Sequence, residues 1–445
     1  MSELPVGWIN AEIGKLCILI NGRAFKPQDW EKEGLPIIRI QNLNRSDASF
    51  NYFNGELDPR HLVNPGQLLF AWSGTPGTSF GAHVWKGKQA ALNQHIFKID
   101  FDESEINKTF FRHAINQKLD ELIASAQGGV GLRHVTKGTF ERTPIALPPL
   151  AEQKRIVQKL DALLAQVDAL KARIDAIPML LKRFRGAVLK AAVAGDLTQK
   201  WRSNRQQIKE STWENTTFSA ICREITVGYV GKMLDQYRPS GVPFLRSQNV
   251  RPFQFSPKNL LYISEEFNAT LSKSRLEPGD LAIVRSGAPG VTCVIPESLV
   301  MANCSDLVIA RPSTKLNSSF GCIFMNSETG QRSVSENQVG VAQQHFNVGS
   351  MKRLKIQLPP IEEQAAIADQ VELLFTLADQ LEAKVSAAQQ RINTLTQSLL
   401  AKAFRGELVP QDPNDEPASA LLERISAQHA AAPKPKRGRK SSATT

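Results

Sequence analysis

Cysteine is scarce in this sequence and follows no pairing pattern. The 445 residues contain five cysteines, an odd number without a CxxC pair: Cys17, Cys222, Cys293, Cys304 and Cys322. Disulfide frameworks use even sets of cysteines, and structural zinc sites use closely spaced pairs. We therefore expect neither a disulfide nor a metal site, and we interpret the five thiols as reduced, buried core residues.

Long apolar runs are also missing. No segment approaches the roughly 20 consecutive apolar residues that a membrane-spanning helix needs. The N-terminus lacks the basic stretch followed by an apolar stretch that marks a secretory signal. We therefore expect a cytoplasmic protein without a membrane segment.

The motifs of common nucleotide-dependent and metal-dependent enzymes are absent as well. The glycines of Gly228-Tyr-Val-Gly231-Lys232 do not have the spacing of a GxxxxGK[ST] phosphate loop, and there is no HExxH zinc motif. Adenine methyltransferases carry Asn/Asp-Pro-Pro-aromatic, whereas leucine precedes both Pro-Pro pairs here. The glycine-rich stretches 73–77 and 128–131 are interpreted as turns. We therefore expect a non-catalytic chain that binds no cofactor.

What the chain does have is a hydrophobic content of 42% and a net charge of +11. The length predicts several compact units, and the positive excess favours a polyanionic partner such as nucleic acid. Five of the positive charges lie in the stretch 433–440, which leaves +6 for the rest of the chain. That stretch is compatible with a non-specific DNA-binding arm and with a disordered, solubilising end.

An internal repeat organises the chain. Ile145-Ala-Leu-Pro-Pro-Leu-Ala-Glu-Gln153 returns 211 residues later as Ile356-Gln-Leu-Pro-Pro-Ile-Glu-Glu-Gln364. Further upstream, Gly34-Leu-Pro-Ile-Ile-Arg-Ile-Gln-Asn42 matches Gly241-Val-Pro-Phe-Leu-Arg-Ser-Gln-Asn249. A period this long indicates a domain duplication rather than a solenoid. Each half is a variable globular part followed by a closely similar helical part.

Apolar residues in both helical parts recur at alternating spacings of four and three, the seam pattern of a coiled coil. The first seam is Ile156, Leu160, Leu163, Val167, Leu170, Ile174, Ile177, Leu181 and Phe184, and the second is Ile367, Val371, Leu374, Ala378, Leu381, Val385, Ala388, Ile392 and Leu395. Because a whole globular part separates the two helices, we expect them to pair in antiparallel orientation. Pro178 is expected to kink or end the first helix.

The variable parts, roughly 1–145 and 205–355, combine strands with helices. Short apolar runs bounded by Gly, Pro and Asn predict strands at 36–40, 67–71, 96–99, 244–245, 280–284 and 307–310. Helical spacing covers 110–126. The predicted fold class is α+β, with two mixed α/β domains separated by two long helices that form an antiparallel coiled coil with pseudo-two-fold symmetry.

The two Leu-Pro-Pro helix starts, the heptads that follow and Leu399-Leu-Ala-Lys-Ala-Phe-Arg-Gly-Glu-Leu408 resemble the specificity subunits of type I restriction-modification systems. The resemblance implies two target recognition domains, each reading one half of a split site in double-stranded DNA. It divides the chain into 1–147 (first target recognition domain), 148–204 (first spacer helix region), 205–358 (second target recognition domain), 359–410 (second spacer helix region) and 411–445 (short helix and basic tail). It also implies partners: two modification subunits, which would bind S-adenosylmethionine and methylate adenine, and restriction subunits, which would use ATP and Mg²⁺.

The repeat constrains which residues could read DNA. Residues shared by both halves cannot discriminate between two different half-sites, so they suit phosphate positioning or scaffold roles: Arg39 and Arg246, Gln41 and Gln248, Asn42 and Asn249, Ser73 and Ser286, His134 and His345. The base readers should be polar residues that differ between the halves. The candidates are Asn44, Arg45, Thr75, Thr78, Lys86 and Arg133 in the first half and Arg251, Arg285, Gln343, Gln344 and Asn347 in the second.

Two other functions compete with this one. A stand-alone nuclease-methyltransferase requires a cofactor or metal motif. A coiled-coil scaffold that does not bind DNA gives no reason for two diverged, Arg-, Asn- and Gln-rich globular parts beside nearly matched helices. Both are kept as alternatives to the DNA-reading subunit.

Overall fold

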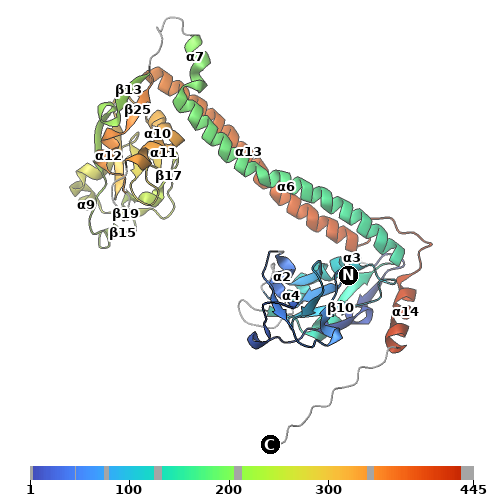
Figure 1. Ribbon diagram of the computed structural model, residues 1–445. Helices are drawn as coiled ribbons and strands as arrows, with labels where there is room; N and C mark the ends of the chain where they lie inside the picture. The colour runs from blue at the N-terminus through green and yellow to red at the C-terminus, as the bar shows by residue number, and fades with distance from the viewer. Residues whose placement is uncertain are drawn as a thin grey trace, which may run out of the picture. The chain divides into compact units, whose positions relative to one another are not determined.

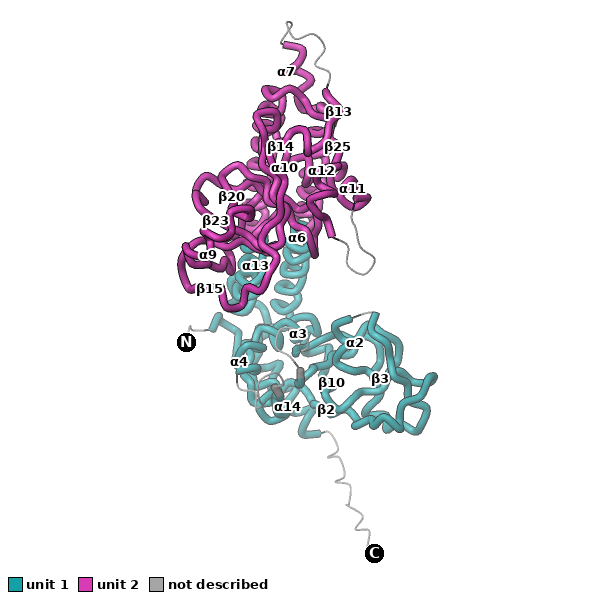
Figure 2. Tube along the Cα trace, turned by 90° about the vertical axis from the view of Figure 1, so that its left-hand side faces the viewer, with its two compact units in different colours: residues 1–172, 389–445 teal, residues 173–388 magenta. Residues whose placement is uncertain are grey.

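The structure is a computed structural model that describes residues 4–45, 47–74, 80–124, 133–204, 213–337 and 345–431. It divides into two compact units, residues 1–172 with 389–445 (unit 1) and residues 173–388 (unit 2), which Figure 2 colours separately. Each unit contains one globular head and a stretch of each of two long helices. We call the globular parts head 1, within residues 4–147, and head 2, within residues 213–358.

Head 1 is built on two four-stranded sheets. The first, which we call the central sheet, has the order β2 (Ile18–Asn21), β10 (Ile96–Asp100), β6 (Leu68–Ala71), β8 (Gly81–Val84). The second has the order β4 (Asn51–Phe53), β3 (Leu35–Ile38), β9 (Ala90–Leu92), β5 (Leu62–Val63). Two short ladders pair β1 (Ile9–Glu12) with β12 (Pro144–Leu147) and β7 (Ser73–Gly74) with β11 (Arg133–His134).

The central sheet of head 1 is buried on both faces. Successive side chains of a strand point to opposite faces. Accordingly, Leu68 and Phe70 of β6 enter one apolar cluster, which includes helix residues, while Leu69 enters another, between the two sheets. The helices of head 1 are α1 (Ile13–Leu16), α2 (Ile40–Asn44), α3 (Lys108–Gln117), α4 (Leu119–Ala124) and α5 (Lys137–Glu141).

Head 2 repeats this plan. Its central sheet has the order β14 (Cys222–Val227), β24 (Leu307–Pro312), β21 (Leu281–Val284), β22 (Thr292–Val294). The second sheet has the order β15 (Tyr237–Arg238), β19 (Leu261–Ile263), β16 (Val242–Leu245), β23 (Ala302–Cys304), β20 (Arg275–Leu276). The short ladders are β13 (Glu214–Thr217) with β25 (Lys355–Leu358) and β17 (Val250–Arg251) with β18 (Gln254–Phe255).

The helices of unit 2 outside the long pair are α7 (Gln199–Ser203), α8 (Phe218–Ile221), α9 (Glu265–Thr270), α10 (Ser318–Asn326), α11 (Glu328–Glu336) and α12 (Val348–Arg353). Single 3₁₀ turns lie at Pro27–Asp29 and Pro59–His61 in head 1 and at Asp196–Thr198, Ser247–Asn249 and Ser272–Ser274 in unit 2.

The strand topology confirms the duplication. The order β2-β10-β6-β8 corresponds to β14-β24-β21-β22, and both second sheets contain one parallel pair, β3 with β9 and β16 with β23. All six predicted strands are present to within a few residues. The predicted helix 110–126 needs a correction, because α3 and α4 are separate helices that meet at Lys118. The side chain of Asn116 bonds both backbone groups of Ala82, which ties the end of α3 to β8.

The two long helices are α6 (Leu150–Ala194) and α13 (Ile361–Phe404), which Figure 1 draws in green and orange. Pro178 lies inside α6, so of the two effects expected of this proline, a kink or a helix end, the helix end does not occur. A proline costs an interior helix about 3 kcal/mol. Leu181, Val188 and Leu189, three to eleven residues further along the helix, are buried, and such packing is the main source of helix stability in a folded protein.

The two long helices run antiparallel. Within unit 1, Ile156 and Leu160 near the start of α6 share a core with Ala403 and Phe404 at the end of α13. Within unit 2, Val188 near the end of α6 shares a core with Ile367 and Val371 near the start of α13. Also within unit 2, Arg185 of α6 forms ion pairs of 2.6 and 2.8 Å with Asp379 and Glu382 of α13. The predicted pairing of the helices is therefore confirmed.

The segment after α13 returns to head 1. Helix α14 (Ala418–Ala431) buries Ala418, Leu421 and Ile425 in the core of unit 1. The guanidinium of Arg424 binds both carboxylate oxygens of Glu105 at 2.9 and 2.7 Å. The short helix predicted before the basic stretch is present. The stretch 433–440 itself lies outside the described residues.

Candidate DNA interface

The shared Arg-x-Gln-Asn motif forms a backbone clamp in each head. Asn42 accepts a hydrogen bond from the backbone N–H of Arg39 at 3.0 Å and donates to the carbonyl groups of Ala48 and Ser49. Asn249 likewise accepts from the N–H of Arg246 at 3.0 Å and donates to the carbonyl groups of Ser256 and Lys258. Both asparagines are buried. Of the two roles predicted for this pair, the scaffold role fits these contacts, because each asparagine side chain is buried and its amide group bonds the backbone.

The other shared residues of the motif are more accessible. Gln41 and Gln248 are exposed, and Gln248 donates to the carbonyl of Asn259 at 3.2 Å. Arg39 lies over the ring of Trp30 at 5.6 Å, while Arg246 donates to the same Asn259 carbonyl at 3.1 Å. These contacts hold the side chains against the head surface and leave charge exposed, which is compatible with phosphate contacts.

The shared helix start Leu-Pro-Pro-x-x-Glu-Gln is a joint between head and helix. In unit 1 the buried carboxylate of Glu152 accepts from the indole N–H of Trp8 at 2.9 Å, and in unit 2 Glu363 accepts from Trp213 at 3.3 Å. Arg202 forms an additional ion pair with Glu363. Burial raises the pKa of Glu152, and the Trp8 hydrogen bond opposes that shift. The sequence identified this motif as a helix start but gave no sign that its acid binds a tryptophan.

A second pair of shared residues, serine and histidine, lies where the central sheet ends. Ser286 and the Nδ1 atom of His345 are hydrogen-bonded at 2.7 Å in head 2. In head 1, Ser73 and His134 occupy paired positions of β7 and β11. The residues beside them differ between the heads: Trp72 and His95 in head 1, Arg285 and Asp306 in head 2. Strand register establishes the correspondence, because Ala71 pairs with Ile96 as Val284 pairs with Leu307.

Three predicted residues of head 1 border one basic hollow. Asn44, Arg45 and Lys86 line a cavity of about 560 Å³ together with Arg112 and the buried ring of Trp85. Arg45 is exposed and paired with Asp47 at 2.9 Å. Arg112 could not be found from the sequence, because only the fold brings α3 next to β8, which ends two residues before Lys86.

The predicted readers of head 2 are not all available. Arg251 is exposed in the hairpin β17–β18. Asn347 caps α12, because its side-chain oxygen accepts from the N–H of Ser350 at 2.9 Å. We therefore withdraw Asn347 as a base reader. Thr75, Thr78, Gln343 and Gln344 lie outside the described residues, as does the side chain of Arg133.

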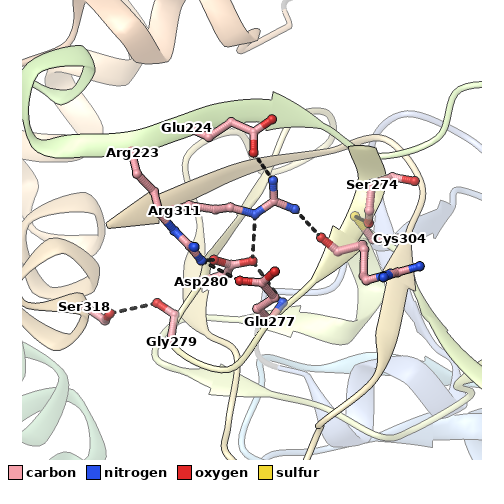
Figure 3. A network of polar contacts seen from close by, with 10 residues as sticks. Arg223, Glu224, Ser274, Glu277, Gly279, Asp280, Cys304, Arg311 and Ser318 are labelled. Atoms are coloured by element: carbon pink, nitrogen blue, oxygen red, sulfur yellow. Dashed lines mark hydrogen bonds and ion pairs between the residues drawn. The ribbon is translucent and has the colours of Figure 1, made fainter. Parts of the chain in front are cut away.

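Arg311 is an arginine of head 2 that is not a candidate base reader, because its side chain is buried. Arg311 of β24 is buried and binds Glu224, the carboxylate of Asp280 at 3.5 Å and the carbonyl of Arg275 at 2.6 Å (Figure 3). Burial raises the pKa of Asp280, and the charge of Arg311 opposes that shift. The guanidinium of Arg311 is therefore occupied inside the head and has a structural role.

The seam residues of each long helix form two alternating sets, each with a spacing of seven residues, and one of these sets is largely buried. Leu160, Val167 and Leu181 are buried in α6, as are Val371, Ala378, Val385 and Ile392 in α13. Toward the middle of each helix the alternate positions are open to solvent: Leu170 and Leu381 are 49% and 41% exposed, so the assignment of these two residues to the helix-pairing core was wrong. A helix with one partner is covered along a single line, so the second line stays open. Leu163, Ile174 and Leu374 are half-buried, whereas Ile156 and Ile367 are fully buried.

The cysteines behave as core residues. Cys17, Cys293, Cys304 and Cys322 are buried and Cys222 is half-buried, and burial raises the pKa of Cys293 to about 12. The described part of the chain contains no cluster of three His, Cys, Asp or Glu side chains suited to a metal ion. Among the helices described, none is long and apolar enough to cross a membrane.

These features define a two-headed protein, a duplicated α+β head attached to an antiparallel pair of helices. Comparison with known proteins identifies its family. The family model described as type I restriction modification DNA specificity domain matches residues 5–179 and 195–388. The chain is 34% identical to the type I restriction enzyme EcoBI specificity subunit of Escherichia coli, over 97% of this chain and 94% of that protein. It is 32% identical to the EcoKI specificity subunit of Escherichia coli strain K12, over 99% of both.

Solved structures agree on the fold. A chain from a study of complex assembly and conformational transition in a type I restriction-modification system has a TM-score of 0.66 at 20% identity, covering 92% of this chain and all of that chain. The HsdS subunit of Thermoanaerobacter tengcongensis has a TM-score of 0.60 at 19% identity, covering 91% of this chain and 98% of that chain. The protein belongs to the family of type I restriction-modification specificity subunits.

Proposed function

We propose that this chain reads a bipartite, asymmetric site in double-stranded DNA, one half-site with each head, and performs no catalysis itself. The observation that carries the proposal is a scaffold that occurs twice, with the same Asn clamp in both heads and different side chains at corresponding surface positions. Two identical heads would suit a symmetric site, whereas unlike heads on one scaffold suit two different half-sites.

Head 1 would read its half-site through the basic hollow. Asn, Arg and Lys side chains offer donors that match purine edges in the major groove, and Asn44, Arg45, Lys86 and Arg112 are gathered there. Thr75, Thr78 and Arg133 in head 1, and Arg251, Gln343 and Gln344 in head 2, remain proposed readers. Arg39, Gln41, Arg246 and Gln248 are proposed phosphate contacts.

The long helices would carry the partner subunits. Apolar side chains are exposed along both helices, among them Leu170 and Met179 on α6 and Leu373, Leu377 and Leu381 on α13. Exposed apolar stripes of this kind mark protein contacts. We assign them to two modification subunits, to which restriction subunits add. S-adenosylmethionine, ATP and Mg²⁺ would then be bound by those partners and not by this chain. A complex that acts on the cell's own DNA would work in the cytoplasm.

The proposal is tested by sequencing the methylated adenines in cells that contain this chain together with its modification subunits. We expect one split sequence, with two defined parts separated by unread positions. Exchange of residues 1–147 for the corresponding part of a relative should then change one half and preserve the other. A contiguous site in the parent, or a change in both halves or in neither, would refute the modular assignment.

A further inference from the structure

One location differs chemically between the two heads although its backbone is the same. Residues 72 and 95 in head 1, and 285 and 306 in head 2, adjoin the ends of paired central strands. The backbone carbonyl of Trp72 accepts from Val135 at 3.0 Å, and that of Arg285 accepts from Phe346 at 3.1 Å. The framework is thus fixed by backbone contacts, and the side chains are free to differ.

In head 2 this location holds an oriented cation. Arg285 donates to Asp306 at 2.8 Å, with 26% and 44% of their side chains exposed. The Nε atom of Arg285 is buried and has no hydrogen-bond partner among the described residues. Asp306 has a φ of +46°, a left-handed conformation that is uncommon in residues other than glycine. Asp306 therefore orients the guanidinium of Arg285, and the Nε–H of that guanidinium makes no hydrogen bond to the described residues.

In head 1 the same location holds aromatic groups. The ring of Trp72 lies 5.4 Å from that of His95 and 5.8 Å from that of His134. Trp72 Nε1, His95 Nδ1 and His134 Nδ1 are buried, and within the described part of the chain none has a hydrogen-bond partner. Buried polar atoms are nearly always paired in folded proteins. Three unpaired polar atoms at one location can be satisfied by ordered water or by the polar groups of a ligand.

We infer that this location determines specificity in each head, and that Arg285, oriented by Asp306, reads a guanine in the second half-site while the Trp72–His95 surface contacts the first. A guanidinium donates two parallel hydrogen bonds to the O6 and N7 atoms of guanine, a pattern that no other base presents in the major groove. Neither Trp72 nor His95 can supply that fork. The inference rests on the proposed function, since it requires each head to read one half-site.

The alternative role of the pair is a structural ion pair, and substitutions separate the two roles. We would prepare the complete complex of this chain with its modification subunits carrying Arg285→Gln, Arg285→Lys or Asp306→Asn. Arg332→Gln is the matched control, because Arg332 forms an exposed ion pair with Glu328 in the same unit. Methylation would be measured on a DNA library in which each position of the second half-site is varied in turn.

We expect Arg285→Gln to lower the preference for guanine at one position of the second half-site by about 10- to 100-fold, the discrimination of one bidentate contact. The first half-site should be unchanged. Arg285→Lys keeps the charge but loses the fork, so it should lose the same preference, and Asp306→Asn should weaken it partly. Arg332→Gln should behave as the parent.

Two results would overturn the inference. One is unchanged specificity in an assembled Arg285 variant. The other is an equal loss of methylation on all sequences, which would make Arg285 a phosphate contact. If both Arg285 variants fail to assemble, the pair is structural and the inference is also wrong. A parent complex without a split site would instead refute the proposed function, so the two failures are distinguishable.

Discussion

The side-chain oxygen of Gln153 accepts a hydrogen bond of 2.9 Å from the backbone N–H of Asn107, and 211 residues later Gln364 accepts one of 2.8 Å from Asn317. Each glutamine also donates to the carbonyl of the first proline in its Pro-Pro pair, Pro148 or Pro359. Asn107 and Asn317 in turn cap α3 and α10. The glutamine thus connects the start of a long helix to the start of a head helix in each unit.

Gln153→Leu should destabilise unit 1. The substitution leaves two buried backbone groups without partners, at a cost of about 1–3 kcal/mol each. Denaturant unfolding of the full chain should show a loss of roughly 2–5 kcal/mol in the transition of unit 1. Gln158→Leu, at an exposed position of the same helix, is the control and should change stability little. Equal stability of the two variants would show that the hydrogen bonds of Gln153 do not stabilise unit 1.

Acidification should destabilise unit 1 through His113. Burial and the neighbouring charge of Arg112 lower the pKa of His113 from 6.5 to about 4, against the opposing effect of Asp161. Between those two values the unfolded chain binds more protons, so stability is full above about pH 6.5 and falls as the pH drops toward 4. The loss is on the order of 3 kcal/mol. Thermal unfolding of His113→Gln should have a flatter pH profile, and an identical profile would disprove the assignment.

The two positions of the helix seam should respond differently to charge. Val167→Asp places an unpaired carboxylate in the buried seam, so it should cost several kcal/mol and weaken helix pairing. Leu170→Asp lies on the exposed line, so folding should be retained and co-purification with the modification subunits reduced. Circular dichroism and affinity co-purification distinguish the outcomes. Full assembly of the Leu170→Asp variant would show that the exposed line does not bind those partners.

The purified chain alone should show no nuclease, methyltransferase or ATPase activity, because the sequence lacks the corresponding motifs. Each activity would be assayed with plasmid DNA and the relevant cofactor. Turnover that copurifies with the chain and disappears with a point substitution in it would establish an enzyme instead.

Much of the fold could be predicted because the repeat acts as an internal alignment. The repeat predicts that the shared residues at 42 and 249 do not discriminate between half-sites, and their burial in matched clamps explains why both halves retain asparagine. The strands were predictable because their apolar runs are short and bounded by turn residues. Antiparallel pairing followed from chain connectivity.

The candidate site was less predictable because it depends on register. Trp72 and His95 are 23 residues apart and meet only through the pairing of β6 with β10. The capping role of Asn347 could not be predicted, because the sequence does not distinguish an asparagine that caps a helix from one that reads a base. Seam periodicity alone also does not say which of two apolar lines a single partner helix covers, which is why Leu170 was misassigned.

The return of α14 to head 1 has a consequence for how the protein is made. A ribosome finishes head 1 first, yet the core of that head lacks Phe404, Leu421 and Ile425 until the end of α14 has been synthesised. Unit 2 consists of one continuous stretch, residues 173–388, and is complete earlier. The part of the chain translated first is therefore the last to reach its final core. A chain truncated after residue 388 would contain all of unit 2, whereas the core of head 1 would be incomplete.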